Sequence, residues 1–120
     1  MKKILLIEDE SALQKTLGGV LTQEGYEVSS ALDGEIGLRT AKAIKPDLIL
    51  LDLILPKMNG FEVLKALKED EETKGIPIIV LTNLEGVEDV DKAISLGAKN
   101  YLVKAQYSLA EVLEKIKGIL

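Results

Sequence analysis

The polar residues best suited to chemistry in this chain stand at, or directly behind, short apolar runs. Glu8 and Asp9 follow one run, Asp52 interrupts another, and Thr82 and Lys104 end two more. Asp52 has four apolar residues before it and three after it, so its carboxylate is expected at the end of a buried strand, where an unpaired charge is costly. If Glu8, Asp9 and Asp52 meet, their like charges repel one another unless a hard cation binds. Oxygen ligands without histidine suit magnesium, and Lys104 would balance the remaining charge.

A carboxylate beside a magnesium ion, a lysine and a hydroxyl has the surroundings needed to receive a phosphoryl group. The charge of the transition state spreads over the equatorial phosphoryl oxygens, so neutralisation and positioning supply most of the catalysis. Asp52 would be the nucleophile, and the product would be an acyl phosphate. Thr82 would donate a hydrogen bond to one phosphoryl oxygen. No separate base is needed, because a carboxylate is already ionised at neutral pH.

Ordinary structural roles compete with these assignments. Acidic residues behind a strand commonly cap the next helix, so Glu8 and Asp9 could do so, with Ser11 also available. Thr82 could build a turn, and a single lysine such as Lys104 is usually exposed on the surface. Both interpretations stay open for each of these residues taken alone.

Five apolar runs predict five strands, and segments of helical period separate them. The strands are expected at 4–7, 28–32, 48–51, 76–81 and 101–103. The helix signals are an apolar stripe ending near Gly25, a segment over 34–44 stopped by Pro46, a cap at Asn59, a stripe through Val87, Val90 and Ile94, and a capping box formed by Ser108 and Glu111. This alternation predicts an α/β fold with a parallel sheet, because parallel neighbours need crossover helices.

Composition limits the possible functions further. The 120 residues predict one domain over 1–120, and the absence of cysteine and histidine excludes disulfides, zinc–thiolate sites and serine–histidine triads. A net charge of −5 argues against direct binding of nucleic acid. The first apolar run ends at Glu8, too early for a signal peptide or a membrane span, so we expect a cytoplasmic protein without membrane insertion.

Taken together, these residues resemble the receiver domain of bacterial two-component response regulators, in particular the single-domain chemotaxis type. The resemblance rests on Glu8-Asp9, on Asp52 in the segment LILLDLILPKMNG, and on Thr82, Tyr101 and Lys104 in that order. It implies a flavodoxin-like, doubly wound sheet of five parallel strands in the order 2-1-3-4-5, with five helices on its two faces. It also implies that Asp52 is the phosphoacceptor and that Mg²⁺ binds to Asp9, Asp52 and the backbone carbonyl of Ile54, with Glu8 acting mainly through water.

The same resemblance implies partners and a switch. A sensor histidine kinase or a histidine phosphotransfer protein would donate the phosphoryl group, and the chain would assist only its own phosphorylation and dephosphorylation. Thr82 would move toward the phosphoryl group, and Tyr101 would turn into the vacated space. This movement would change the face formed by the fourth helix, fifth strand and fifth helix, which would signal to a downstream protein. A monomer or a weak homodimer is expected.

Three alternatives are kept. The chain could be a receiver excised from a larger regulator, or a degenerate receiver that binds partners without phosphorylation. A small nucleotide- or flavin-binding module would share the topology, but the chain has neither G-x-G-x-x-G nor G-x-x-x-x-G-K-[ST]. Behind Lys104, Ala105 replaces the family's usual proline, which often follows a cis peptide bond, so we expect a trans bond here.

Overall fold

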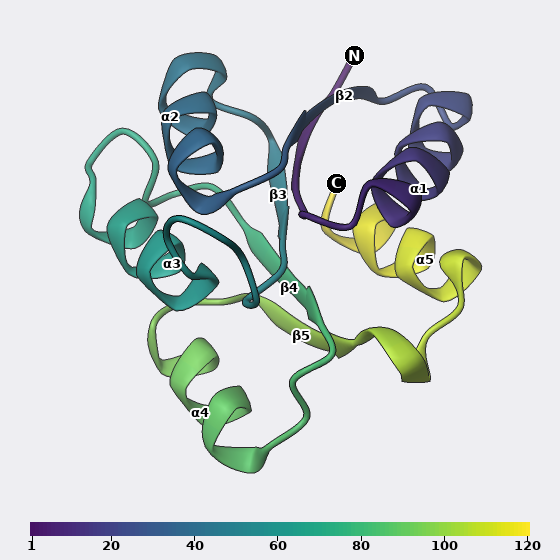
Figure 1. Ribbon diagram of the computed structural model, residues 1–120. Coiled ribbons are helices and arrows are strands. Elements are labelled where there is room, and N and C mark those ends of the chain that lie inside the picture. Colours follow the sequence, from purple (N-terminus) through teal and green to yellow (C-terminus); the bar gives the residue numbers. More distant parts are fainter.

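The computed structural model describes residues 1–120 and contains a five-stranded parallel sheet with helices on both faces (Figure 1). The strands are β1 (Lys3–Ile7), β2 (Glu27–Ala31), β3 (Leu48–Leu51), β4 (Ile78–Thr82) and β5 (Asn100–Val103). The helices are α1 (Ser11–Gln23), α2 (Gly34–Ile44), α3 (Gly60–Glu69), α4 (Val87–Ser95) and α5 (Leu109–Ile119), with a 3₁₀ turn over Lys104–Gln106. The strand order is β2-β1-β3-β4-β5, which confirms the predicted doubly wound α/β fold.

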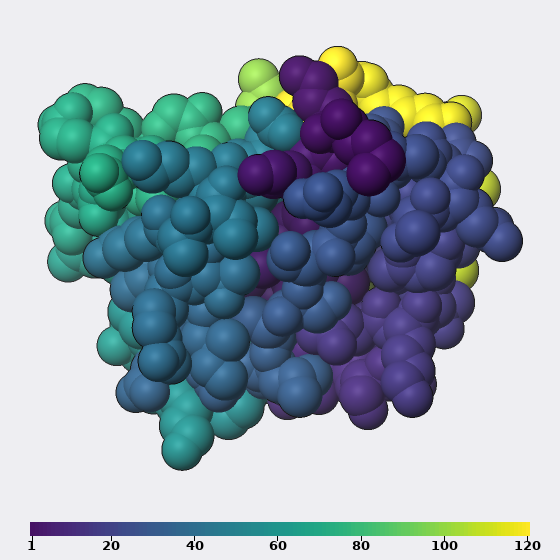
Figure 2. Space-filling model, turned by 90° about the horizontal axis from the view of Figure 1, so that it is seen from above, coloured from purple at the N-terminus to yellow at the C-terminus, as the bar shows by residue number.

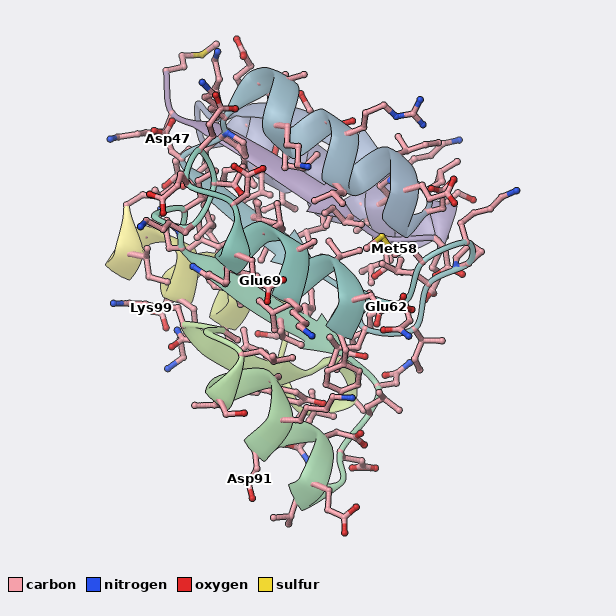
Figure 3. The ribbon with its side chains drawn as sticks, turned by 90° about the vertical axis from the view of Figure 1, so that its left-hand side faces the viewer. Asp47, Met58, Glu62, Glu69, Asp91 and Lys99 are labelled. Atoms are coloured by element: carbon pink, nitrogen blue, oxygen red, sulfur yellow. The ribbon has the colours of Figure 1, made fainter.

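Two apolar layers hold the helices against the sheet. Residues of α1 and α5, including Leu17 and Ile116, form one layer with β1, β3, β4 and β5. Residues of α2, α3 and α4, including Ala41, Leu64 and Ala93, form the other, and Figure 3 shows these three helices side by side. Strands β3 and β4 are completely buried because both of their faces are covered, which explains their continuous apolar sequences.

The local sequence signals for helix ends are confirmed. The side chain of Asn59 accepts a hydrogen bond from the Glu62 N–H at 3.0 Å and so caps α3. Ser108 and Glu111 form both hydrogen bonds of the predicted capping box at the start of α5. Gly25 has a φ of 93°, the left-handed conformation that ends α1 and favours glycine. No peptide bond is cis, so the predicted trans bond before Ala105 is also confirmed.

The predicted fourth helix is present as α4 and carries Val87, Val90 and Ile94. Its apolar stripe does not form the core contact of the helix, because Val87 and Ile94 are 75% and 47% exposed. Ala93 is the buried residue of α4, so this helix meets the core through a small side chain and leaves larger apolar side chains on the surface.

Both chain ends lie at the end of the sheet opposite to the carboxyl ends of the strands, and Figure 2 shows them on the same surface (Figures 1 and 2). The N-terminus leads directly into β1, and α5 runs back against the strand direction. The carboxyl ends of the strands are therefore free of the chain termini.

Among the five helices, none has the length and apolar character needed to cross a membrane.

Replacing Thr73 by valine should lower the free energy of unfolding by about 1–2 kcal/mol, because the buried Leu67 carbonyl loses its hydrogen bond from the Thr73 hydroxyl. The Thr73 hydroxyl is fully buried and donates a 2.7 Å hydrogen bond to the Leu67 carbonyl, one of the last in α3 and without an intrahelical partner. Urea denaturation measures the change. The matched control is Thr16→Val, because the exposed Thr16 hydroxyl bonds to the Ala12 carbonyl, and we expect less than about 0.5 kcal/mol there. Equal effects of the two changes would contradict the prediction.

Candidate functional site

The sheet register brings the chemically suited residues to one edge. Ile7 of β1 pairs with Leu51 of β3, so the next residues, Glu8 and Asp52, leave neighbouring strands side by side. The Asp52 N–H donates to the Ile7 carbonyl at 3.0 Å and fixes this alignment. Thr82 ends β4 next to β3, and Lys104 follows β5. All these residues therefore lie at the carboxyl edge of the sheet, where open α/β folds bind ligands.

Three carboxylates gather at this edge as the sequence predicts. One oxygen from each of Glu8, Asp9 and Asp52 lies within 4.8 Å of the others. Glu8 and Asp52 are buried, whereas Asp9 is exposed. The cluster contains only hard oxygen donors and opens to solvent on the side of Asp9. This donor set fits a divalent cation such as Mg²⁺ better than a transition metal.

The Lys104 ammonium holds the buried carboxylates together. Its Nζ lies 2.8 Å from Glu8 Oε1, 2.9 Å from Asp52 Oδ2 and 3.7 Å from the exposed Glu10. Burial alone would lower the pKa of Lys104, but the hydrogen bonds to Asp52 and Glu8 outweigh it and raise this pKa. Burial raises the pKa of Glu8, and the Lys104 ammonium and the Glu10 N–H offset only part of that rise. Lys104 is therefore a fixed positive charge in direct contact with Asp52.

Thr82 and Tyr101 meet at the loop between β4 and α4. Thr82 is fully buried, and its hydroxyl oxygen lies 3.5 Å from the Leu84 N–H, at the limit of a hydrogen bond. The half-buried Tyr101 donates its hydroxyl proton to the Leu84 carbonyl at 2.7 Å. Burial, with smaller contributions from Asp89 and Asp52, raises the pKa of Tyr101. Leu84 is thus the backbone link between the two residues.

Ile54 lies in the loop behind Asp52, and its N–H donates to Asp52 Oδ1 at 3.1 Å. Its side chain is 52% exposed, as expected for a residue that contributes only its backbone. Both oxygens of Asp52 therefore have a partner, one the Ile54 N–H and the other Lys104.

The competing capping roles are absent. Glu10 is the N-terminal cap residue of α1 and makes no side-chain capping bond. The Glu8 carboxylate accepts the N–H of Glu10 itself at 3.1 Å and no N–H of the first helical turn, and the Asp9 side chain accepts none. Helix α4 begins behind Gly86, so Thr82 does not cap it. The competing turn role of Thr82 is present in a weak form, because its hydroxyl oxygen faces the Leu84 N–H, two residues on, at 3.5 Å. Lys104 is largely buried, which excludes an ordinary surface lysine.

One residue of this edge was missed in the sequence. The Gln14 side-chain amide donates to the carbonyls of Glu8 at 3.2 Å and Ala31 at 3.3 Å, and so ties α1 to the residue behind β1 and to the last residue of β2. In the sequence, Gln14 is one polar residue among others on a helix. No spacing or motif distinguishes it from a solvent-facing side chain.

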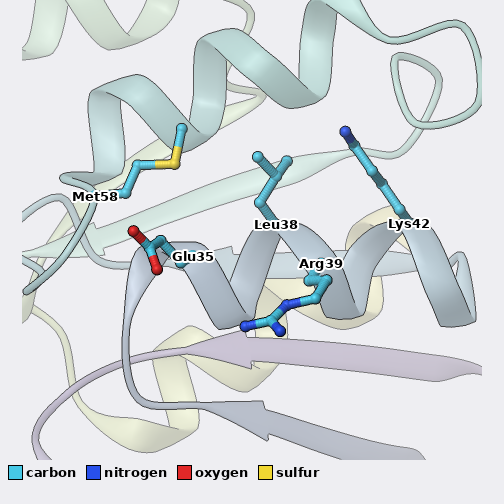
Figure 4. A pocket seen from close by; sticks show the side chains of 5 residues that line it. All are labelled: Glu35, Leu38, Arg39, Lys42 and Met58. Carbon is cyan, nitrogen blue, oxygen red and sulfur yellow. The ribbon is translucent and has the colours of Figure 1, made fainter.

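The larger of two surface cavities, about 370 Å³, lies away from the acidic cluster (Figure 4). Its lining comes from α2 and from the loop before α3: Glu35, Leu38, Arg39, Lys42 and Met58. Lys42 also pairs with Asp70 at 3.5 Å. None of the clustered carboxylates borders this cavity.

Comparison with known proteins gives one family. The family model of the response regulator receiver domain matches residues 4–117. Over all 120 residues the chain is 38% identical to the DNA-binding dual master transcriptional regulator RpaA of Synechocystis, and it spans 49% of that regulator's length. The comparison thus extends over the whole of this chain and about half of the relative.

Solved structures agree with the sequence comparison. The chemotaxis protein CheY4 of Vibrio cholerae is 31% identical, with a TM-score of 0.91 over 100% of this chain and 99% of that one. The receiver domain of the sensor histidine kinase PA1611 of Pseudomonas aeruginosa is 29% identical, with a TM-score of 0.87 over 98% of this chain and 95% of that one. The PA1611 structure has a magnesium ion coordinated in its active site cleft.

Proposed function

The chain belongs to the response regulator receiver family, and we propose from this that it accepts a phosphoryl group on Asp52 from a phosphohistidine of a partner protein. The observation that carries the proposal is the buried Asp52 carboxylate held at 2.9 Å from the Lys104 ammonium. A buried carboxylate with a single fixed cation beside it is placed to act as a nucleophile whose product is stabilised by the same cation.

In the proposed step, an Asp52 carboxylate oxygen attacks the phosphorus atom and a new O–P bond forms. The P–N bond of the donor phosphohistidine breaks, and its electron pair remains on the imidazole nitrogen of the partner. Lys104 neutralises charge on the phosphoryl oxygens, and the Thr82 hydroxyl donates a hydrogen bond to one of them. The product is an aspartyl phosphate.

We propose that a divalent cation, Mg²⁺ by the chemistry of the donors, binds beside Asp52. The side chains of Asp9 and Asp52 and the backbone carbonyl of Ile54 would hold it, and Glu8 would act mainly through water. The magnesium ion of the PA1611 receiver supports this assignment. When bound, such a cation neutralises the carboxylates and the phosphoryl oxygens.

We further propose that phosphorylation shifts the population of two arrangements of Thr82 and Tyr101. Thr82 gains a bond to the phosphoryl group in only one of them, and this difference biases the equilibrium. The shared backbone contact at Leu84 supports a coupled movement of the loop before α4. The face formed by α4, β5 and α5 would then present a different surface, and the exposed Val87 and Ile94 support its use in protein contact.

Several wider assignments stay predictions. A histidine kinase or phosphotransfer protein is the proposed donor, and the downstream target is a protein and not nucleic acid or a membrane. A cytoplasmic location, a monomeric or weakly dimeric state, and a single receiver domain over 1–120 belong to the same proposal. The lack of cysteine agrees with a reducing compartment. A degenerate, phosphorylation-independent module is the alternative, and the intact cluster argues against it.

Incubation with Mg²⁺ and acetyl phosphate should add one phosphoryl group that is stable in acid and labile in base. Intact-mass spectrometry measures the gain, and backbone amide NMR of the same sample should show shifts in the loop before α4 and in β5. EDTA in place of Mg²⁺ is the control and should prevent the gain. No mass gain with Mg²⁺ would rule out the proposed function in favour of the degenerate module.

A further inference from the structure

The larger surface cavity, between α2 and the loop before α3, has an apolar floor that is anchored in the core (Figure 4). Leu38 and Met58 form this floor, and both side chains also pack against the buried core of that face. The volume of about 370 Å³ lies within the range of small-molecule sites. The floor can therefore receive an apolar group without rearrangement of the core.

The backbone holds the two walls of this cavity at a fixed distance. The Gly34 N–H at the start of α2 donates to the Pro56 carbonyl at 3.3 Å. A Cβ atom at Gly34 would overlap the carbonyl group of Met58, so α2 and the loop are in direct backbone contact. Because this contact fixes the loop that carries Met58 against α2, the cavity is already formed without a ligand.

Two cations at the rim of the cavity are available to an anion. Arg39 is the only arginine among the 15 cationic residues of the chain. Its side chain is exposed and forms none of the ion pairs of the protein. Lys42 pairs only with Asp70, at 3.5 Å and with both side chains partly exposed, so this pair contributes little to stability. A planar guanidinium fits both oxygens of a carboxylate, which favours that group over other anionic ligands of one charge.

The single anion of the rim, Glu35, determines which way a ligand lies. Glu35 and Lys42 mark opposite ends of the cavity (Figure 4), seven residues or about 10 Å apart along α2. The charge of Glu35 is favourable in the first turn of α2 and repels an anion at that end. A carboxylate therefore belongs at the end of Arg39 and Lys42, with the rest of the ligand over the apolar floor.

We propose that this cavity binds a small organic carboxylate with a short hydrocarbon part. The carboxylate would pair with Arg39 and Lys42, and the hydrocarbon part would cover Leu38 and Met58. Five residues line the cavity, which is room for one small body and not for an extended chain, so a free small molecule is favoured over a segment of a partner protein. The proposal does not rest on phosphorylation, because no residue of the acidic cluster borders the cavity.

Titration with sodium hexanoate at constant ionic strength tests this site. The ¹³C-labelled methyl groups of Leu38 and Met58 should shift saturably in NMR spectra, with a Kd of about 1 mM, as expected for so small a ligand. Acetate has the carboxylate without the hydrocarbon part and should bind at least about tenfold more weakly. Hexylammonium should cause no saturable shift. Equal shifts with hexylammonium, or no saturation with hexanoate, would overturn the proposal.

Three substitutions at the rim separate the contributions of charge and shape. Arg39→Gln should weaken hexanoate binding about fivefold to tenfold, the scale of a charge-assisted hydrogen bond. Arg39→Lys should weaken it about threefold, because the charge remains and the planar fork is lost. Glu35→Gln should strengthen it about twofold, because a like charge is removed. Unchanged affinity in Arg39→Gln, or weaker binding in Glu35→Gln, would contradict the proposed orientation and overturn the proposal.

The matched control is Lys92→Gln at the other surface cavity. Lys92 lines that cavity of about 260 Å³, and its ammonium lies 4.5 Å from the centre of the Phe61 ring. This change removes one exposed positive charge, as Arg39→Gln does, and should alter hexanoate affinity by less than about twofold. A loss as large as that of Arg39→Gln would show unspecific attraction of anions to the surface and would overturn the proposal.

The titration uses unphosphorylated protein in EDTA, so its result is separate from that of the proposed function. If the protein takes up no phosphoryl group but binds hexanoate as described, the proposed function fails and the carboxylate site stands. A capped dipeptide of leucine and glutamate is the last probe. If it binds in the cavity more tightly than hexanoate, the site belongs to a segment of a partner protein and the small-molecule assignment is overturned.

Discussion

Replacing Asp52 by asparagine should abolish phosphoryl uptake and leave the fold intact. The amide has nearly the same shape as the carboxylate but lacks the ionised oxygen that attacks phosphorus. Its carbonyl oxygen can still accept the Ile54 N–H, and Lys104 keeps Glu8 as an ionic partner. Intact-mass spectrometry after incubation with acetyl phosphate and Mg²⁺ measures uptake, and cooperative thermal unfolding tests the fold.

The control for this change is Asp91→Asn. Asp91 is an exposed carboxylate of α4 that points outward from the helix (Figure 3), and it is not a member of the acidic cluster. Its replacement removes the same charge from the chain and should leave uptake within about twofold of wild type, as is usual for a surface change. A base-labile phosphoryl group that persists in Asp52→Asn would place the acceptor on another carboxylate, with Asp9 the first candidate because it is the exposed member of the cluster.

Much of the fold could be predicted because the sequence patterns are local and agree with one another. The continuous apolar runs of β3 and β4 identify central strands of a parallel sheet. The cap at Asn59 and the capping box at Ser108 depend on residues three positions apart, so they can be recognised without tertiary information. The position of Glu8, Asp52 and Lys104 at one edge of the sheet follows from the common direction of the strands.

The orientation of α4 could not be predicted in the same way. Helical periodicity shows which residues share a face, but not which face meets the sheet. The space above β4 and β5 admits Ala93, whereas Val87 and Ile94 remain exposed. Which apolar stripe is buried depends on the volume left by the neighbouring helix, and that volume is a property of the whole fold.

The ion pairs within the site also could not be predicted from the sequence. Spacing places Lys104 near Asp52 but cannot show that its ammonium is shared with Glu8 at nearly the same distance. In this contact one oxygen of Glu8 faces Lys104, while the other accepts the Glu10 N–H at 3.1 Å. Such details arise from side-chain packing in three dimensions and leave no pattern along the chain.

Replacing Gly60 by alanine should lower the free energy of unfolding by about 3 kcal/mol and also slow phosphoryl uptake. Gly60 is the first residue of α3, and its N–H donates to the Leu53 carbonyl at 2.9 Å. A Cβ atom there would lie 2.3 Å from the Asp52 carbonyl oxygen and 2.4 Å from Leu53 Cα. Both neighbours are backbone atoms, so α3 would have to move away from the end of β3. Because this movement displaces the Asp52 backbone itself, we expect uptake to fall by about tenfold to a hundredfold.

The sign of the change in unfolding free energy on Gly60→Ala shows whether the steric clash or the helix propensity of alanine dominates. Alanine favours a helix over glycine by up to about 1 kcal/mol, so propensity alone predicts that Gly60→Ala stabilises the protein. Gly118→Ala in α5 is the matched control, because no atom lies within 4 Å of the added Cβ, and it should be neutral or stabilising. Urea denaturation of both variants measures the difference. If Gly60→Ala is as stable as Gly118→Ala and takes up phosphate at the wild-type rate, the close approach of α3 to Asp52 does not position the acceptor.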